Sequence, residues 1–297
     1  MKQFIGFLAK GVAFIVTNLP RSVQMALGSA IGRLWFDVLR IRRKIAIDNV
    51  TIAYPELSLK ERTRIARASL ISMGQTLVEY FSFPFLKSET IRERFEIEGE
   101  EHMINALAQG RGVIMLTLHL GNGDYALTGL SRMGYPINLI SKEFKARWLN
   151  DLWFGMRKKQ GTKFIAPEKS SFDILKALRR KEVVVFVLDQ FMGPPVGVRT
   201  RFFGKVTGTA MGCAIISDRT KAPVLPAYTY RRRNGQAVIA FDPVMPDTLT
   251  AASPDHSLRD ENIAVMTQSY TDKIESIVRR HPDQWMWIHR RWKEFRD

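Results

Sequence analysis

The segment His119-Leu-Gly-Asn-Gly-Asp124 places a histidine, a flexible loop and a carboxylate directly after the apolar run 113–118. A strand that ends before such a loop can present an imidazole at the edge of a sheet. A carboxylate on one ring nitrogen fixes the tautomer and stabilises the imidazolium, so the other nitrogen can accept a proton from a hydroxyl near neutral pH. The spacing therefore predicts a general base, His119, oriented by Asp124, and the chemistry indicated is acyl transfer to an alcohol.

A histidine and an aspartate five positions apart also occur by chance, and such a pair then has no catalytic role. The context favours catalysis, because the pair follows an apolar strand and because Gly121 and Gly123 permit a close backbone approach. The other histidines lie in charged or proline-flanked stretches, where a surface or structural role is expected: His102, His256, His281 and His289.

The composition is that of a folded protein with a strong positive charge. Of 297 residues, 45% are hydrophobic and 25% are charged, and the length permits one large domain. The net charge of +16 predicts an anionic partner, which is a nucleic acid, an anionic lipid surface or an acidic protein. A basic cluster at 40–44 follows a strongly apolar N-terminus, and this order favours a membrane surface. The single cysteine, Cys213, excludes an internal disulfide and fits a reducing compartment.

Two apolar segments, 4–19 and 23–39, open the chain. The first contains Lys10 and is slightly shorter than the roughly 20 residues that cross a bilayer. No small-residue cleavage site follows Leu19-Pro20, so we expect an uncleaved membrane anchor rather than a signal peptide. Two alternatives are a pair of core helices in a soluble protein and a helix that lies in the membrane interface.

The periodicity of the chain predicts helices first and an α/β sheet afterwards. Segment 56–85 has apolar residues at helical spacing, opens with the capping pattern Ser58-x-x-Glu61 and ends near Pro84. From about residue 95, short apolar runs alternate with helical segments, which is typical of α/β folds. The expected strands are 113–118, 137–141, 183–188, 224–230 and 236–241, and the expected helices are 99–109, 124–133, 145–160, 170–180, 208–220 and 261–280.

Ligands of such sheets collect where the strands end, so polar residues there are candidate site residues. Three strand ends carry them: His119, Ser141-Lys142 and Asp189-Gln190. The last pair is followed by the rigid turn Gly193-Pro194-Pro195 and then by Arg199 and Arg201, whose guanidinium groups suit phosphate. Each of these residues also has a structural interpretation, as a turn, a cap or a solvated charge.

Further short motifs follow one another along the chain: Leu27-Gly28, Ile31-Gly32-Arg33-Leu34, Arg42-Arg43-Lys44-Ile45-Ala46-Ile47-Asp48-Asn49-Val50, Tyr54-Pro55-Glu56-Leu57, Phe202-Phe203-Gly204 and Thr207-Gly208-Thr209-Ala210. Together with the 119–124 motif and Asp189-Gln190, they resemble the lipid A biosynthesis acyltransferase family. This family contains the late acyltransferases of bacterial outer-membrane glycolipid synthesis and belongs to the lysophospholipid acyltransferase superfamily. The Trp- and Arg-rich stretch 285–293 also matches, and we interpret it as packing plus membrane-interface anchoring, with a buried aromatic role as the alternative.

The resemblance implies an α/β fold with a mixed sheet flanked by helices, glycerol-3-phosphate acyltransferase-like, with N-terminal membrane-associated helices. Residues 1–90 are then the membrane-anchoring and amphipathic helices, and 91–297 the acyltransferase domain, in one continuous folding unit. It further implies a bacterial inner-membrane enzyme whose site faces the cytoplasm, a donor thioester of acyl carrier protein or coenzyme A, and a membrane glycolipid acceptor. The thioester is a co-substrate, and no cofactor or metal is expected.

By this resemblance, His119 is the general base and Asp124 is the acid that orients it. Substrate contacts are expected at Asn122, Lys142, Arg157, Asp189, Gln190 and Arg201. The chain departs from the family where Ser141-Lys142 replaces a frequent Tyr-Arg pair, because lysine is a point charge without the two-pronged contact of arginine. Asp124 also stands where glutamate is common, which shortens the side chain by one methylene.

Three other functions are compatible with the sequence. An enzyme of the same chemistry can act on another lipid hydroxyl, such as that of a phosphatidylinositol mannoside or an ornithine-type aminolipid. A basic nucleic-acid-binding protein fits the charge, but the sequence has no nucleic-acid-binding motif, so we expect no such partner. The third is a catalytically silent lipid-binding homologue, against which the intact His119 and Asp124 argue.

Overall fold

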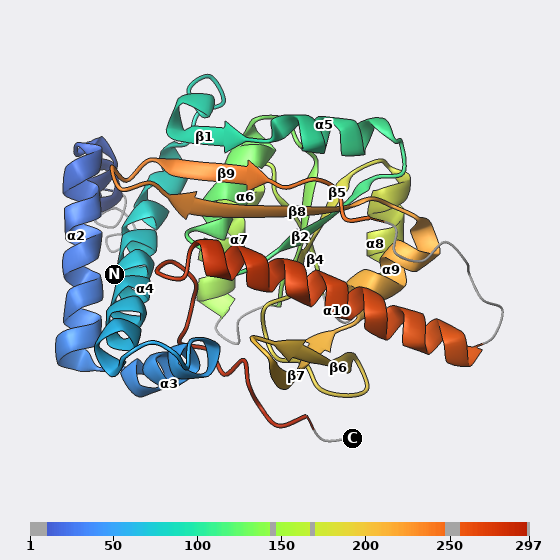
Figure 1. Ribbon diagram of the computed structural model, residues 1–297. Coiled ribbons are helices and arrows are strands. Elements are labelled where there is room, and N and C mark those ends of the chain that lie inside the picture. Colours follow the sequence, from blue (N-terminus) through green and yellow to red (C-terminus); the bar gives the residue numbers. More distant parts are fainter. Residues whose placement is uncertain (1–10, 143–146, 167–169, 247–255, 296–297) are drawn as a thin grey trace.

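One seven-stranded mixed sheet forms the centre of the structure, a computed structural model that describes residues 11–142, 147–166, 170–246 and 256–295. The strand order is β1-β9-β8-β2-β5-β3-β4 (Figure 1). Strands β8, β2, β5, β3 and β4 run parallel, β9 is antiparallel to β8, and β1 is parallel to β9. The bounds are Phe95–Glu98 for β1, Val113–Thr117 for β2, Ile137–Ile140 for β3, Lys163–Ile165 for β4, Val183–Val187 for β5, Val224–Arg231 for β8 and Ala237–Phe241 for β9.

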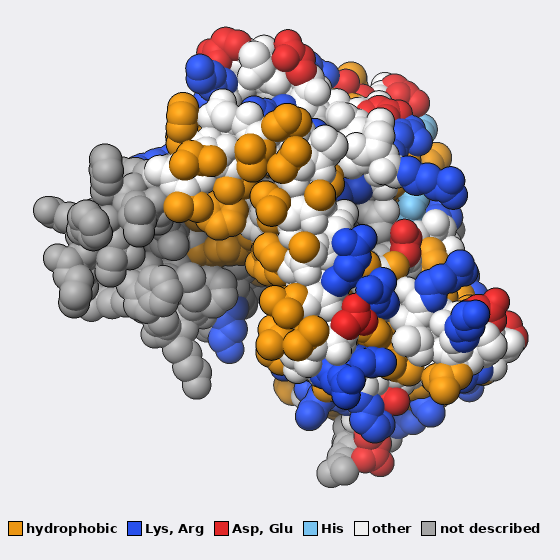
Figure 2. All heavy atoms as spheres, turned by 90° about the vertical axis from the view of Figure 1, so that its left-hand side faces the viewer, with side chains coloured by type: hydrophobic (Ala, Val, Ile, Leu, Met, Phe, Trp, Pro, Cys, Tyr) orange, Lys and Arg blue, Asp and Glu red, His pale blue; other side chains and the backbone are white. Residues whose placement is uncertain are grey.

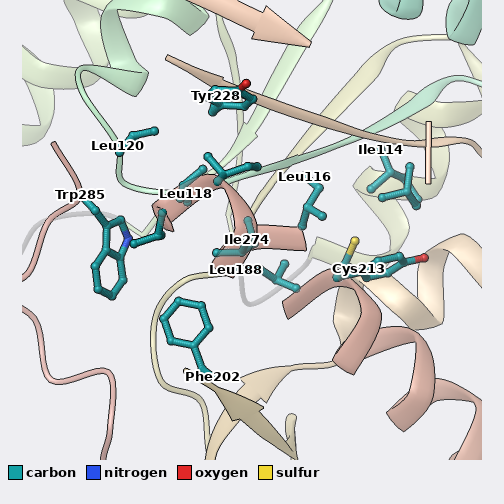
Figure 3. Close-up of a cluster of buried hydrophobic side chains, with 14 of the residues drawn as sticks. Ile114, Leu116, Leu118, Leu120, Leu188, Phe202, Cys213, Tyr228, Ile274 and Trp285 are labelled. Atoms are coloured by element: carbon teal, nitrogen blue, oxygen red, sulfur yellow. The ribbon is translucent and has the colours of Figure 1, made fainter. Parts of the chain in front are cut away.

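Helices cover both faces of this sheet because its central strands are apolar on both sides. Ile114 and Leu116 of β2 pack into one core cluster with α8 (Ser170–Arg179), α9 (Gly212–Thr220) and α10 (His256–Arg280). The alternate residues Val113 and Met115 pack into a second cluster with α5 (Glu100–Ala108) and α6 (Gly123–Arg132). Figure 3 shows part of the first cluster, with Leu118, Leu188 and Trp285 beneath the end of β2.

The N-terminal helices pack against this α/β unit and share its first core cluster. Their bounds are Arg21–Arg33 for α2, Leu34–Leu39 for a π-helical turn, Arg43–Ala53 for α3, Leu59–Glu79 for α4, and Tyr80–Phe85 and Arg92–Arg94 for two 3₁₀ turns; α7, further along the chain, is Arg147–Lys159. The expected capping box of α4 is present, since the Ser58 and Glu61 side chains each bind the backbone N–H of the other.

Helix α2 lies against α4 with glycines at the contact. A Cβ atom on Gly32 would collide with the backbone of Ile71, and one on Gly28 would collide with the backbone of Gln75. On the other helix, Gly74 leaves the matching space for Gly28. Because small residues let two helix backbones approach closely, Gly28 and Gly32 allow α2 to pack tightly on α4.

The opposite side of α2 carries apolar side chains that the described residues leave exposed. Figure 2 views this face and shows them gathered over it, with Lys and Arg side chains beside one end. We call this surface the α2 apolar face; its residues are Val23, Leu27 and Ile31 of α2 with Leu34, Val38, Leu39 and Ile41, each 39–67% exposed. In the described ranges, no helix combines the length and the hydropathy needed to span a bilayer. Residues 4–10 of the expected first apolar segment, 4–19, lie outside the described part, and residues 11–18 are helical.

The strands and helices that the sequence predicts are present, with shifts of a few residues at their ends. The exception is segment 208–220, whose first residues belong to a strand, so that α9 begins at Gly212. Two short strands, β1 and β4, and the antiparallel hairpin of β6 (Gly197–Phe202) and β7 (Lys205–Ala210) were not predicted. The turn expected at 193–195 is present at 194–196, but Arg199 and Arg201 after it lie on strand β6 of this hairpin.

Replacing Gly32 by leucine should separate α2 from α4, because the new side chain must displace the α4 backbone. We expect a loss of about 1–3 kcal/mol in the free energy of unfolding, the usual cost of overpacking. Urea unfolding measures it. Ala30→Leu, on the exposed side of the same helix, is the control and should be nearly neutral. Equal stability of the two variants would contradict the observed α2–α4 contact.

Candidate functional site

His119 and Asp189 meet where two adjacent parallel strands end. Strands β2 and β5 pair in register, with Thr117 opposite Val187. Two residues beyond this pair, His119 Nδ1 and Asp189 Oδ1 are 2.8 Å apart. The register of the strands, rather than the loop that follows His119, therefore supplies the carboxylate that binds the imidazole.

Asp189 is completely buried, and both of its oxygens accept hydrogen bonds. Besides the bond to Nδ1, its Oδ2 accepts the backbone N–H of His119 at 2.9 Å and the indole N–H of Trp285 at 2.8 Å. Burial by itself would raise the pKa of the Asp189 carboxyl, but the imidazole and backbone N–H of His119 hold that pKa well below its usual range. The carboxylate is thus ionised at neutral pH and fixed in one orientation. We expected Asp189 to contact substrate, but in the structure its side chain is buried and binds His119.

The imidazole of His119 is both basic and accessible. Burial lowers its pKa, but the charge and hydrogen bond of Asp189, with a further contribution from the charge of Asp124, raise the pKa above the usual 6.5. Since Asp189 takes Nδ1, the nitrogen left for a substrate is Nε2, and 38% of the side chain is exposed. His119 therefore has the geometry of a general base.

Asp124 does not bind the imidazole, contrary to the expectation from the sequence. Gly123 already begins α6, so Asp124 lies in the first turn of that helix. Its Oδ2 accepts the hydroxyl of Tyr80 at 3.1 Å and pairs with Arg157 Nη2 at 2.6 Å. The ring nitrogen that we had assigned to Asp124 is bound by Asp189, and Asp124 acts on the ring through its charge.

Arg157, expected to contact substrate, is 2% exposed and belongs to a packed cluster. Its guanidinium lies over the ring of Trp153, 3.8 Å from the ring centre, and pairs with Asp124. The Trp153 ring in turn packs edge-on against Tyr80. This cluster joins α7, α6 and the 3₁₀ turn after α4, and Asp124 extends its charge toward His119.

Asn122 holds the loop after His119 onto α4. Its side-chain oxygen accepts the backbone N–H of Tyr125 at 3.0 Å, and its Nδ2 donates to Glu79 Oε2 at 2.9 Å. Burial would raise the pKa of Glu79, but Arg231 and Arg21 hold it at about 2. Both polar atoms of Asn122 are thus engaged within the protein, which indicates a role in loop position rather than in substrate contact.

The two loop glycines differ. Gly121 has a φ of +56°, and a Cβ atom there would lie 2.6 Å from the carbonyl oxygen of Thr229, so this position requires glycine. A Cβ atom on Gly123 would contact no described atom, so the prediction of a close backbone approach at this residue is wrong.

The other residues expected to bind substrate lie at different places. Lys142 is exposed just beyond β3, on the same sheet edge as His119. Gln190 has an exposed side chain, and its carbonyl accepts a bond from Arg291 Nη1 at 3.2 Å. Arg201 is exposed on β6 and bonds to the carbonyl of Gly204 at 3.0 Å; no contact within the described residues joins it to His119.

The C-terminal segment forms part of the site, which the sequence did not reveal. The backbone N–H of Met286 donates to the carbonyl of His119 at 3.1 Å, and Trp285 binds Asp189. Trp285 and Trp287 are fully buried. Their interpretation as membrane-interface anchors is wrong, and the alternative of a buried aromatic role is confirmed. The Trp- and Arg-rich composition of the stretch was the available signal.

Two cavities flank the sheet at opposite edges. One of about 350 Å³ lies beyond the ends of β3 and β4, between Ser141, Phe164 and the Phe154 and Lys158 side chains of α7. Another of about 200 Å³ includes Arg111 and Pro223, which precede β2 and β8 and so mark the edge away from His119. Within the described ranges, no three His, Cys, Asp or Glu side chains are grouped as metal ligands would be.

Comparison with known proteins identifies the family of this chain. A family model described as bacterial lipid A biosynthesis acyltransferase matches residues 1–294. The chain belongs to this family. It is therefore an O-acyltransferase, and the resemblance drawn from the sequence motifs is confirmed.

Relatives named for two different lipids are similar to this acyltransferase. It is 26% identical to the lipid A biosynthesis lauroyltransferase and also to the lipid A biosynthesis palmitoleoyltransferase of Escherichia coli (strain K12), each over 98% of this chain and 92% of the relative. It is 24% identical to the phosphatidylinositol mannoside acyltransferase of Mycobacterium tuberculosis (strain ATCC 25618 / H37Rv), over 76% of this chain and 69% of that protein.

The pH dependence of acyl transfer should separate the two carboxylates. A general base must be neutral, so the rate should fall as the pH falls through the pKa of His119, with a midpoint above 6.5 because that pKa is raised. Asp189→Asn should move this acidic limb to lower pH and reduce kcat roughly 10²- to 10⁴-fold. Asp124→Asn should move it less, and kcat/KM profiles measure both shifts. A larger shift and loss for Asp124→Asn would restore Asp124 as the orienting acid.

Proposed function

We propose that this enzyme transfers a fatty acyl chain from a thioester to a hydroxyl of a lipid A precursor or a closely related glycolipid. The observation that carries the proposal is the 2.8 Å contact between His119 Nδ1 and the buried Asp189 carboxylate at two adjacent strand ends. Membership of the family supports acyl transfer, and relatives named for lipid A biosynthesis match 98% of the chain.

In the proposed reaction, His119 Nε2 accepts the proton of the lipid hydroxyl while the hydroxyl oxygen attacks the thioester carbonyl. A carbon–oxygen bond forms, and Asp189 stabilises the imidazolium. The tetrahedral intermediate then collapses, the carbon–sulfur bond breaks, and the imidazolium returns the proton to the leaving sulfur. The products are an ester and a free thiol, and the acyl group is never attached to the protein.

Charged residues around His119 support this step. Asp124 lies close enough for its charge to raise the pKa of His119, which makes the imidazole a stronger base. The paired guanidinium of Arg157 keeps that carboxylate in place. Lys142, exposed at the same sheet edge, supplies a point charge for a phosphate of the acceptor or for the developing oxyanion.

The donor is assigned to acyl carrier protein or coenzyme A. Both are anionic, and the net charge of +16 favours their approach and that of a phosphorylated lipid. A second acceptor class, phosphatidylinositol mannoside, is favoured by the mycobacterial relative.

We place the enzyme on the cytoplasmic surface of the bacterial inner membrane, and the α2 apolar face supports contact with a bilayer. Its exposed side chains follow one another at helical spacing along α2, and the basic cluster at 40–44 lies directly beyond them in the chain. An apolar helix face next to basic side chains fits a bilayer with anionic lipids, in which the helix lies in the interface.

Product masses test the proposed reaction. Purified enzyme is given acyl carrier protein or coenzyme A thioesters together with a lipid A precursor or a phosphatidylinositol mannoside. We expect the lipid A precursor to gain one acyl chain and His119→Ala to lower turnover at least about 100-fold. Transfer to the mannoside alone would establish the second acceptor class, and full activity of His119→Ala would refute the mechanism.

Vesicle binding tests the α2 apolar face. Leu27→Asp with Ile31→Asp should weaken binding to phosphatidylglycerol-containing vesicles at least about tenfold, since each change removes apolar area from the interface. Ile104→Asp, at a residue that is 55% exposed on α5, is the matched control and should bind like the wild type. Unchanged binding of the α2 variant in a flotation assay would count against this membrane-facing surface.

A further inference from the structure

A second imidazole lies against the catalytic carboxylate, and the reaction described above does not use it. His289 Nε2 is 3.8 Å from Asp189 Oδ2, on the other oxygen from the one that binds His119 Nδ1. The ring centres of the two histidines are 6.1 Å apart. The side chain of His289 is 12% exposed, and its Nε2 is buried without a hydrogen bond to any described residue.

The backbone around His289 is held firmly. Asn49 Nδ2, from α3, donates to the carbonyl of Trp287 at 2.7 Å and to that of His289 at 2.8 Å. Arg42 Nη1 donates to the carbonyl of Ile288 at 3.2 Å. The imidazole also packs edge-on against the Trp285 ring, at 5.0 Å between centres. Its place beside Asp189 is therefore set by several independent contacts.

His289 is neutral where His119 is basic. Burial lowers the pKa of His289, and the positive charges of His119, Arg291 and Arg42 lower it further, so that it is about 4 despite the charge of Asp189. These are the charged groups that face it from its own segment, from the ends of β2 and β5, and from the residues before α3. One carboxylate thus lies between two imidazoles, of which only His119 takes up a proton near neutral pH.

We propose that His289 is a positioning residue of the acyl-transfer site, whose neutral ring closes the remaining approach to Asp189 and keeps water from that carboxylate. The proposal rests on the proposed role of His119 and Asp189. Asp189 Oδ2 is already bound by Trp285 and by the backbone of His119. Because the His289 ring occupies the space that remains beside this oxygen, solvent does not screen the negative charge of Asp189. A charge that is not hydrated acts more strongly on its partner, so Asp189 holds the His119 imidazolium more tightly.

Three variants of the full-length enzyme test this role. His289→Ala opens the space beside Asp189 to water. His289→Gln fills much of that space and keeps a polar nitrogen near the position of Nε2. His281→Phe is the matched control, because His281 belongs to the same C-terminal region but stacks on Tyr230.

The first measurement needs no acyl substrate. The rate at which diethyl pyrocarbonate modifies His119 is followed by mass spectrometry of its peptide over a range of pH, and it reports the pKa of the exposed imidazole directly. We expect His289→Ala to lower that pKa by about half a unit or more, because water would solvate Asp189. His289→Gln and His281→Phe should leave it near the wild-type value. This readout stands even if the acyl acceptor proposed above is wrong.

The second measurement is acyl transfer. His289→Ala should lower kcat about tenfold, with KM within about twofold and the acidic limb of the pH profile moved to lower pH. His289→Gln should restore most of kcat. A wild-type pKa and kcat in His289→Ala, equal impairment of the glutamine and alanine variants, or a loss confined to KM would each overturn the proposal. If His289→Ala does not fold, His289→Asn, which leaves less of the space open, must show the same direction of both shifts.

Discussion

The site depends on one buried negative charge, that of Asp189. A carboxylate without exposure to solvent is stable only when hydrogen bonds and positive charge surround it. Here the donors come from segments far apart in the sequence: the imidazole and backbone N–H of His119 and the indole of Trp285. The ends of two strands and the C-terminal segment are thereby brought to one point. The basicity of His119 is the functional result of that arrangement.

Much of the fold follows from the sequence, because the parallel strands are continuous apolar runs and the helices carry clear periodicity and caps. The strands around His119, the capped helix α4 and the family were all predicted correctly. The hairpin of β6 and β7 was not, since its arginines and threonines form no apolar run. The edge strand β1 contains two glutamates among its four residues, and β4 has only three residues, too few for a period to show.

The histidine itself could be found from its loop, but its partner could not. Sequence spacing suggested the nearby Asp124, whereas the neighbour in space is fixed by which strands pair and in what register. Asp189 had been recognised as a polar residue at a strand end, and the missing information was that β5 lies next to β2. Trp285 and His289 show the same limit more strongly, because nothing local in their sequence indicates contact with a carboxylate about a hundred residues earlier.

The hydrogen bond from the backbone N–H of Met286 to the carbonyl of His119 has a consequence for how the enzyme folds during synthesis. Strands β2 and β5 precede this stretch in the chain, so during synthesis His119 and Asp189 are present before Trp285 and Met286, which also bind them, have been made. We therefore expect the contacts around His119 and Asp189 to be complete only after residue 286 has been made and has packed against the sheet.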